Sequence, residues 1–161
     1  MHIKGVNLGN WLVLEKWMSP ALFEGTGAQD EYYLPRWLSR EVYEARIRIH
    51  RSEYITERDF AAIRAMGMEA VRIPVPYFIF GDREPFIGCV EELDRAFCWA
   101  ERYGLKILID LHTAPEGRTA LTTEVYAACA DGQRIRQRWN LSWEFWNGWQ
   151  SGTAKERGCG E

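Results

Sequence analysis

The sequence has no apolar stretch that approaches the roughly 20 residues needed to span a membrane. Its first residues, Met1 to Gly5, also lack the basic segment and the apolar segment that form a secretory signal. Both absences lead us to expect a chain that makes no contact with a membrane and stays in the cytoplasm.

The sequence also lacks a large excess of charge of either sign, and it lacks metal-binding motifs. The net charge is -3 with the signs interspersed, so no basic stripe is available for nucleic acid. The four cysteines are unevenly spaced and form no C-x-x-C pair that would hold zinc, so we expect buried free thiols. We expect no metal and no cofactor, and the sequence gives no indication of oligomeric state.

An apolar content of 47% and an aromatic content of 14% allow one sizeable core. Apolar runs predict a strand near 6–14 that leads into an aromatic-rich loop over 15–37, and further strands over 70–75 and 105–109. Apolar residues at helical spacing predict helices from Thr56 to Gly67 and from Val90 to Tyr103, the second closed by Gly104. This alternation is typical of a parallel α/β fold.

Two polar side chains, Arg72 and His112, fall at the C-terminal ends of predicted strands. Functional residues of barrels gather at such ends, although a charged residue there is also commonly paired for structural reasons. Placement alone therefore indicates a site without establishing one.

Four ordered blocks of the sequence resemble the family five glycoside hydrolases, in particular their exo-β-1,3-glucanase-like branch. The resemblance covers about the first 115 residues. The blocks are Lys4–Trp17, Ile55–Phe60, Gly67–Pro74 and Leu105–Pro115. The family implies a (β/α)8 barrel, of which this chain would hold about the first three βα units, and a retaining hydrolase of O-glycosyl bonds in a β-glucan or β-glucoside.

The resemblance implies three supporting site residues. Arg72 matches the arginine that braces the nucleophile, with a structural ion pair as the alternative. His112 matches the histidine that lines the sugar site, with a backbone-satisfied histidine as the alternative. Glu15 matches the acidic residue that contacts the terminal glucose, and an ordinary exposed glutamate is an equally good interpretation. Four aromatic residues could stack on sugars or pack the long loop: Trp11, Trp17, Phe23 and Trp37.

Both catalytic glutamates of the family follow later strands, the fourth and the seventh. We therefore expect this chain to be a truncated part of the enzyme, with no catalytic carboxylate and no activity alone. Its first unit is residues 1–115.

The resemblance stops abruptly after Pro115, which predicts an out-of-frame tail over 116–161. Codons permitted by this tail, read from the last nucleotide of the Pro115 codon, give Gly-Arg-Gln-Asn-Gly-Leu-Asp-Asn-Gly-Gly, which is the turn that the family has there. A tail of this origin should be disordered, because its apolar residues were never arranged against the strands.

Two other functions remain as alternatives. The chain could be a small non-catalytic carbohydrate-binding module that stacks Trp143 and Trp146 on polysaccharide, or a small intact enzyme that uses Glu15 and Glu144 as its carboxylate pair. Neither accounts for the four ordered blocks.

Overall fold

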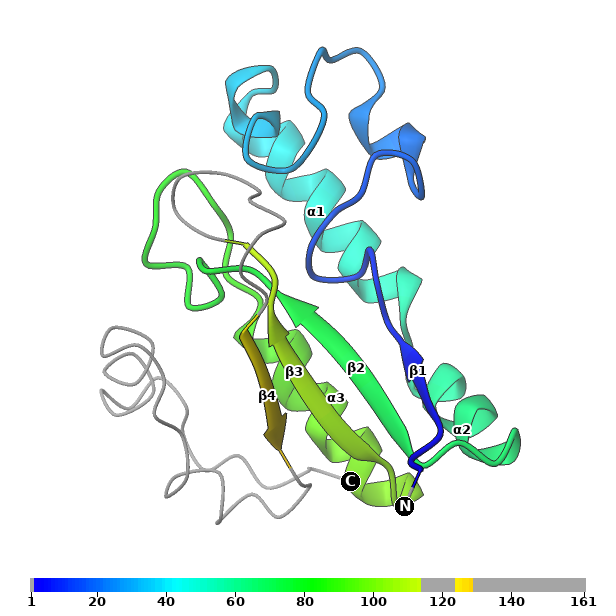
Figure 1. Cartoon of the computed structure of the whole chain (residues 1–161). Coiled ribbons are helices and arrows are strands. Elements are labelled where there is room, and N and C mark those ends of the chain that lie inside the picture. Colours follow the sequence, from blue (N-terminus) through cyan, green and yellow to red (C-terminus); the bar gives the residue numbers. More distant parts are fainter. Residues whose placement is uncertain (1, 114–123, 129–161) are drawn as a thin grey trace.

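The computed structural model describes residues 2–113 and 124–128. Its centre is one sheet with the strand order β1-β2-β3-β4 (Figure 1). The strands are β1 (Gly5–Asn7), β2 (Ala70–Val75), β3 (Lys106–Leu111) and β4 (Glu124–Ala128). The first three strands are parallel, whereas β4 pairs with β3 in the antiparallel direction.

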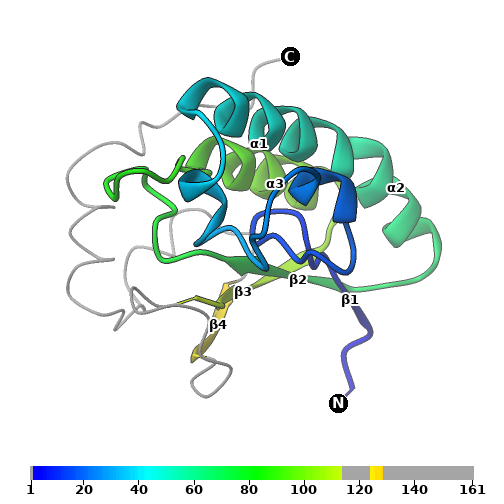
Figure 2. The same cartoon turned by 90° about the horizontal axis from the view of Figure 1, so that it is seen from above.

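Three α-helices connect the parallel strands. They are α1 (Arg40–Tyr54), α2 (Glu57–Ala65) and α3 (Val90–Tyr103), and two short 3-10 helices, η1 (Pro20–Phe23) and η2 (Leu34–Arg36), lie in the loop after β1. All three α-helices lie on one side of the sheet (Figure 2). In the part of the chain that the structure describes, no helix is long and apolar enough to cross a membrane.

The sheet has two unlike faces because side chains alternate along each strand. Val71, Ile73, Ile107 and Ile109 point to the helix side and are buried. They pack with residues of α2 and α3 in the main core, which includes Phe60, Leu93, Ala96 and Ala100. The opposite face carries Asn7, Arg72, Leu108 and Asp110, so it is the face on which polar chemistry is possible.

Local signals set the helix ends. The Asp59 carboxylate accepts hydrogen bonds from the backbone N–H of Thr56 at 2.7 Å and from its hydroxyl at 2.8 Å, which fixes the start of α2. Gly67 and Gly104 follow α2 and α3 with φ of 77° and 63°, a left-handed conformation that suits glycine at a helix end. These boundaries agree with the sequence predictions.

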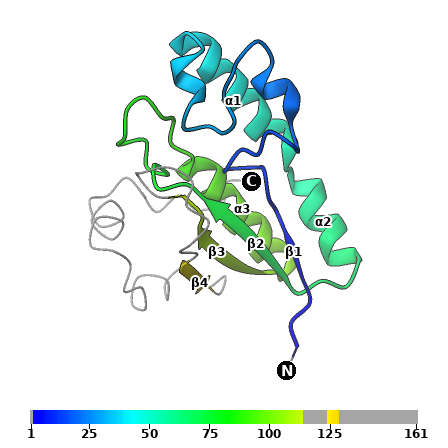
Figure 3. The same cartoon turned by 45° about the horizontal axis from the view of Figure 1, so that its top comes forward.

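The segment between β1 and α1 has its own small core. It lies with α1 beyond the C-terminal ends of β1 and β2 (Figure 3). The buried residues of this core are Leu14, Phe23, Ala28 and Leu34 of the segment and Tyr43 and Ile47 of α1. Beside them the Arg51 guanidinium contacts Glu31 at 3.4 Å and donates to the carbonyls of Ile87 and Gly88 at 3.1 and 2.8 Å, so three distant segments meet at one buried cation.

The structure corrects four expectations. Helix α1 was not predicted, because two of its buried residues, His50 and Arg51, are polar and two exposed ones, Val42 and Ile49, are apolar. The first strand is short, ending at Asn7, because the chain then turns, so that Leu8, Trp11 and Leu12 enter the main core and Leu14 enters the small core. Residues 124–128, expected to be disordered with the rest of 116–161, form β4, whose backbone satisfies the free edge of β3. Cys89 is a buried free thiol as expected, but Cys98 is disulfide-bonded.

Candidate functional site

Polar side chains from three adjacent strands meet on the face of the sheet away from the helices. Asn7 is opposite Arg72 in the register of β1 and β2, and Arg72 is opposite Leu108 in the register of β2 and β3. Asp110 is two residues beyond Leu108 and therefore on the same face. Parallel strands thus bring an amide, a guanidinium and a carboxylate together from positions up to 103 residues apart.

Asp110 is the centre of this cluster, and none of its side chain is exposed. Its Oδ2 accepts a hydrogen bond from Arg72 Nη2 and lies 2.8 Å from Nδ1 of His112. Arg72 Nη1 also donates to Oδ1 of Asn7 at 2.7 Å. The guanidinium is held at two points, and a charge-assisted bond to a fully desolvated carboxylate is the stronger kind. The two expected site residues, Arg72 and His112, therefore share one buried anion.

The side chains of Arg72 and His112 remain 29% and 24% exposed, although Asp110 between them is buried. A ligand can therefore reach both residues while their common partner stays out of water. This combination gives polar groups with fixed positions at an accessible surface, which is what recognition of a polar ligand requires.

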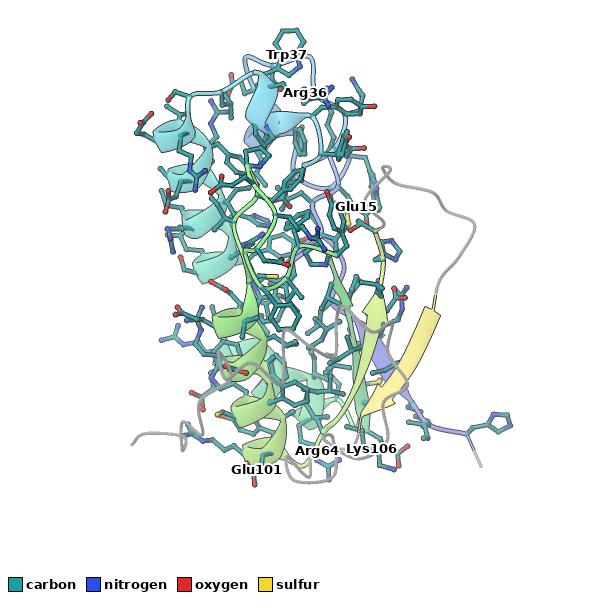
Figure 4. The ribbon with its side chains drawn as sticks, turned by 90° about the vertical axis from the view of Figure 1, so that its left-hand side faces the viewer. Glu15, Arg36, Trp37, Arg64, Glu101 and Lys106 are labelled. Atoms are coloured by element: carbon teal, nitrogen blue, oxygen red, sulfur yellow. The ribbon has the colours of Figure 1, made fainter. Side chains whose placement is uncertain are left out.

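Glu15 lies beyond the C-terminal ends of the strands, on the same end of the sheet (Figure 4). A Cβ atom added at Gly9 would be 3.1 Å from Nδ2 of Asn7 and 3.9 Å from Oε1 of Glu15. Gly9 therefore lies between Glu15 and Asn7, the residue that binds Arg72. Because glycine has no side chain, nothing at this position fills the space between these two polar groups. His112 directly follows β3 at this end, whereas Arg72 is the third residue of β2 and lies within the strand, not at its C-terminal end as predicted. Its guanidinium still reaches Asn7 and Asp110.

The backbone around Glu15 is fixed by Asn10, which is fully buried and has a φ of 62°. Asn10 Oδ1 accepts from the backbone N–H of Glu15 at 2.7 Å, and its Nδ2 donates to Ser19 at 2.7 Å. The backbone carbonyl of Asn10 also lies 2.6 Å from Nε2 of His50. Asparagine tolerates this left-handed conformation better than most residues, and its side chain also makes the hydrogen bonds to Glu15 and Ser19.

The four candidate aromatic residues divide into two pairs. Trp11 and Phe23 are buried and pack the protein, so they are not available to a sugar. Trp17 and Trp37 are 76% and 59% exposed. The indole N–H of Trp17 donates to Oε2 of Glu15 at 2.7 Å, which places this exposed ring directly beside the candidate site.

Sequence reasoning did not select Asp110 or Asn7 as site residues. A signal for Asp110 was present, because it is an acidic residue inside an otherwise apolar, buried strand, and such a charge needs a partner. Asn7 gave no comparable signal, since asparagine is ordinary at the end of a strand. Its role becomes visible only through the register between β1 and β2.

Within residues 2–113 and 124–128, no group of three or more His, Cys, Asp or Glu side chains lies where it could hold a metal ion. Three residues considered above, Trp143, Trp146 and Glu144, lie outside the described residues, as does most of the predicted out-of-frame tail.

Comparison with known sequences confirms the resemblance. The chain is 47% identical over 118 residues to a probable glucan 1,3-beta-glucosidase A of Emericella nidulans, a match that covers 70% of this chain and 29% of the relative. It is 40% identical over 126 residues to a glucan 1,3-beta-glucosidase of Kluyveromyces lactis, again covering 70% of this chain and 29% of the relative. The chain thus spans less than a third of the length of these relatives. No family model matches it.

Solved structures agree with the sequences. The crystal structure of a protein named AoRut superposes with a TM-score of 0.64 at 30% identity, covering 74% of this chain and 35% of that one. A rutinosidase from Aspergillus niger superposes with a TM-score of 0.62 at 26% identity, covering 70% of this chain and 33% of that one. The chain therefore has the fold of a partial N-terminal region of glycoside hydrolases.

Proposed function

We propose that this chain is part of a retaining glycoside hydrolase, similar to the glucan 1,3-beta-glucosidases, that cleaves O-glycosyl bonds in a β-glucan or β-glucoside. The observation that carries the proposal is the 47% identity over 118 residues, in a chain whose polar cluster includes Asn7, Asp110 and His112 at or near the C-terminal ends of parallel strands. Barrel enzymes have their active sites at that end.

The chemistry of such an enzyme assigns a role to each residue. Retaining hydrolysis needs two carboxyl groups about 5 to 5.5 Å apart, one that protonates the leaving oxygen and one that attacks the anomeric carbon. Arg72 would brace the attacking carboxylate, because each Nη that already donates to Asn7 or Asp110 carries a second N–H. His112 would contact a sugar hydroxyl.

Glu15 would bind hydroxyl groups of the terminal glucose. Its carboxylate is oriented by the Trp17 indole, and a carboxylate has about four lone-pair sites, so it can accept further hydrogen bonds. The exposed ring of Trp17 could then cover the apolar face of the same sugar.

The isolated chain should bind sugar weakly and hydrolyse nothing. The resemblance places the two catalytic glutamates after the fourth and seventh strands of the barrel, whereas the structure describes three parallel strands. None of Arg72, His112 and Glu15 supplies the acid or the nucleophile. We expect no release of p-nitrophenol from p-nitrophenyl β-D-glucoside and no glucose from β-1,3-glucan.

Binding tests the proposal directly. We expect titration with laminaribiose, followed by NMR, to shift resonances at Glu15 and His112. Replacing Glu15 with Gln removes hydrogen bonds to a charged acceptor, each worth about 1.5–3 kcal/mol, and should weaken binding roughly 10- to 100-fold. Glu53→Gln, on the exposed side of α1, is the matched control and should bind like the parent. Equal binding by both variants would contradict the site.

The alternative of a non-catalytic carbohydrate-binding module gives the opposite pattern. Binding would then be lost on replacing Trp143 or Trp146 and would be unaffected by Glu15→Gln. Resequencing the DNA through the codons for Pro115 and Glu161 separates the two ideas independently. A second frame that continues the family sequence supports the hydrolase.

A further inference from the structure

The two carboxylate oxygens of Asp110 have unequal surroundings. Oδ2 receives both Arg72 and His112, whereas Oδ1 is buried and has no hydrogen-bond partner within the described part of the chain. Because Arg72 and His112 both contact Oδ2, this one oxygen sets the positions of both side chains. The contact to His112 is the informative one, because an imidazole exists in two neutral forms that differ in which nitrogen carries the proton.

We propose that Asp110 is a positioning residue that holds His112 in the Nδ1–H tautomer, so that Nε2 faces its ligand as a hydrogen-bond acceptor. Asp110 Oδ2 already accepts from the Arg72 guanidinium, whose nitrogens can only donate, so this oxygen acts as an acceptor. A nitrogen 2.8 Å from such an oxygen must carry the proton. In the neutral ring, Nε2 is then the lone-pair nitrogen.

The position of His112 leaves Nε2 available. His112 donates its backbone N–H to the carbonyl of Val75 at 2.9 Å, which anchors the residue directly after β3. No hydrogen bond to Nε2 occurs among the residues that the structure describes, and the ring is 24% exposed. Nε2 is therefore fixed in position and, within the described residues, has no hydrogen-bond partner.

His50 provides an internal reference with the opposite arrangement. Its Nε2 lies 2.6 Å from the backbone carbonyl of Asn10, and a carbonyl can only accept, so Nε2 of His50 carries the proton. Burial lowers the pKa of His50, which keeps the ring neutral near pH 7. One protein therefore holds two histidines in opposite tautomers, one fixed by a carboxylate and the other by a backbone carbonyl.

The functional consequence rests on the function proposed above. If a sugar occupies the site, the hydroxyl group that meets Nε2 of His112 must donate its hydrogen. An ether or methoxy oxygen at the same place has no hydrogen to donate and would face a lone pair. Asp110 thereby contributes to ligand selection without touching the ligand, because it decides whether His112 donates or accepts.

The test is a long-range ¹H–¹⁵N spectrum of the histidine rings, recorded on the ¹⁵N-labelled 161-residue chain at pH 7.5. The sequence contains three histidines, and His112→Asn identifies the signals of His112 by their loss. We expect a pyrrole-type Nδ1 and a pyridine-type Nε2 for His112, and the reverse for His50. An Nε2–H ring or a doubly protonated ring at His112 overturns the proposal, and this result needs no variant of Asp110.

Variants of Asp110 then identify the cause. Asp110→Ala removes the acceptor, and the tautomer of His112 should shift to Nε2–H or to an average. Asp110→Asn keeps an oxygen that can occupy the position of Oδ2, so it should restore the Nδ1–H form. Asp82→Ala, at an exposed aspartate, is the matched control and should change nothing. An unchanged His112 ring in a folded Asp110→Ala chain, judged by the unchanged His50 signals, excludes Asp110 as the cause.

A final titration with methyl β-D-glucopyranoside separates this inference from the proposed function. We expect Nε2 of His112 to shift while Nδ1 stays pyrrole-like, which supports both. A sugar that shifts Glu15 but not Nε2 of His112 overturns the acceptor role alone. If no signal shifts, the sugar site itself fails, although the tautomer and its dependence on Asp110 would still stand on the spectra without sugar.

Discussion

Glu31 is a carboxyl group buried beside Arg51, and burial raises its pKa above the ordinary value of 4.5 even though Arg51 and the Tyr43 hydroxyl lower it. Below pH 4.5 both the folded and the unfolded chain hold this proton. As the pH rises, the unfolded chain loses the proton first, so the contribution of Glu31 to stability is lost as the pH passes through its folded-state pKa.

Glu31→Gln should remove this loss. The free energy of unfolding of the parent chain minus that of the variant should fall as the pH rises from 4 to 7, measured by urea denaturation. Glu44→Gln, at the half-exposed partner of Arg48, is the matched control for the substitution and should change the free energy of unfolding by less than about 1 kcal/mol. A difference for Glu31→Gln that stays constant or rises with pH would contradict the buried assignment.

At the residue scale, the sequence could predict the charged members of the site and not the group that organises them. Arg72, His112 and Glu15 were found because motif blocks surround them. Asp110 and Asn7 act through contacts with Arg72, which lies 38 and 65 positions away from them, respectively. Such contacts depend on strand register, which a single sequence does not specify locally.

At the scale of elements, the capping group of α2 can be tested alone. Asp59→Ala removes the carboxylate that accepts two hydrogen bonds from Thr56, and we expect a loss of about 1 kcal/mol in the free energy of unfolding. Arg58→Ala changes an exposed neighbour in the same turn and should alter stability by less than about 0.5 kcal/mol. Equal effects of the two substitutions on chemical denaturation would show that the cap is not formed.

Elements whose apolar residues recur at regular spacing were predicted, and α1, whose buried residues are partly polar, was missed. Helix α3 matches its prediction because apolar spacing and Gly104 agree on its bounds, and β2 matches because the β-branched residues Val71, Ile73 and Val75 recur at every second position. Helix α1 was missed although Ser39 caps it, since its buried residues Tyr43, Ile47, His50 and Arg51 include two that are not apolar. Tertiary packing, not composition, buries that face.

At the scale of the whole molecule, the two faces of the sheet should respond differently to truncation. Ile107→Ala opens a cavity in the core between sheet and helices and should cost about 2–5 kcal/mol. Leu108→Ala, one residue further on the opposite and half-buried face, should cost about 1 kcal/mol. Urea denaturation of the two variants compares the two faces directly. A larger loss in the free energy of unfolding for Leu108→Ala than for Ile107→Ala would contradict the assignment of the main core to the helix side.

The junction at Asn10 has a consequence for the order of folding events. Asn10 joins its own loop at Glu15 and Ser19 and reaches α1 at His50, 40 residues away. The pairing of β1 with β2 closes a still longer loop, from Gly5 to Ala70. Contacts that close long loops form late, so both of these follow the local bonds of Asn10 to Glu15 and Ser19. The loop around Glu15 can therefore take its shape before the sheet beneath it is complete.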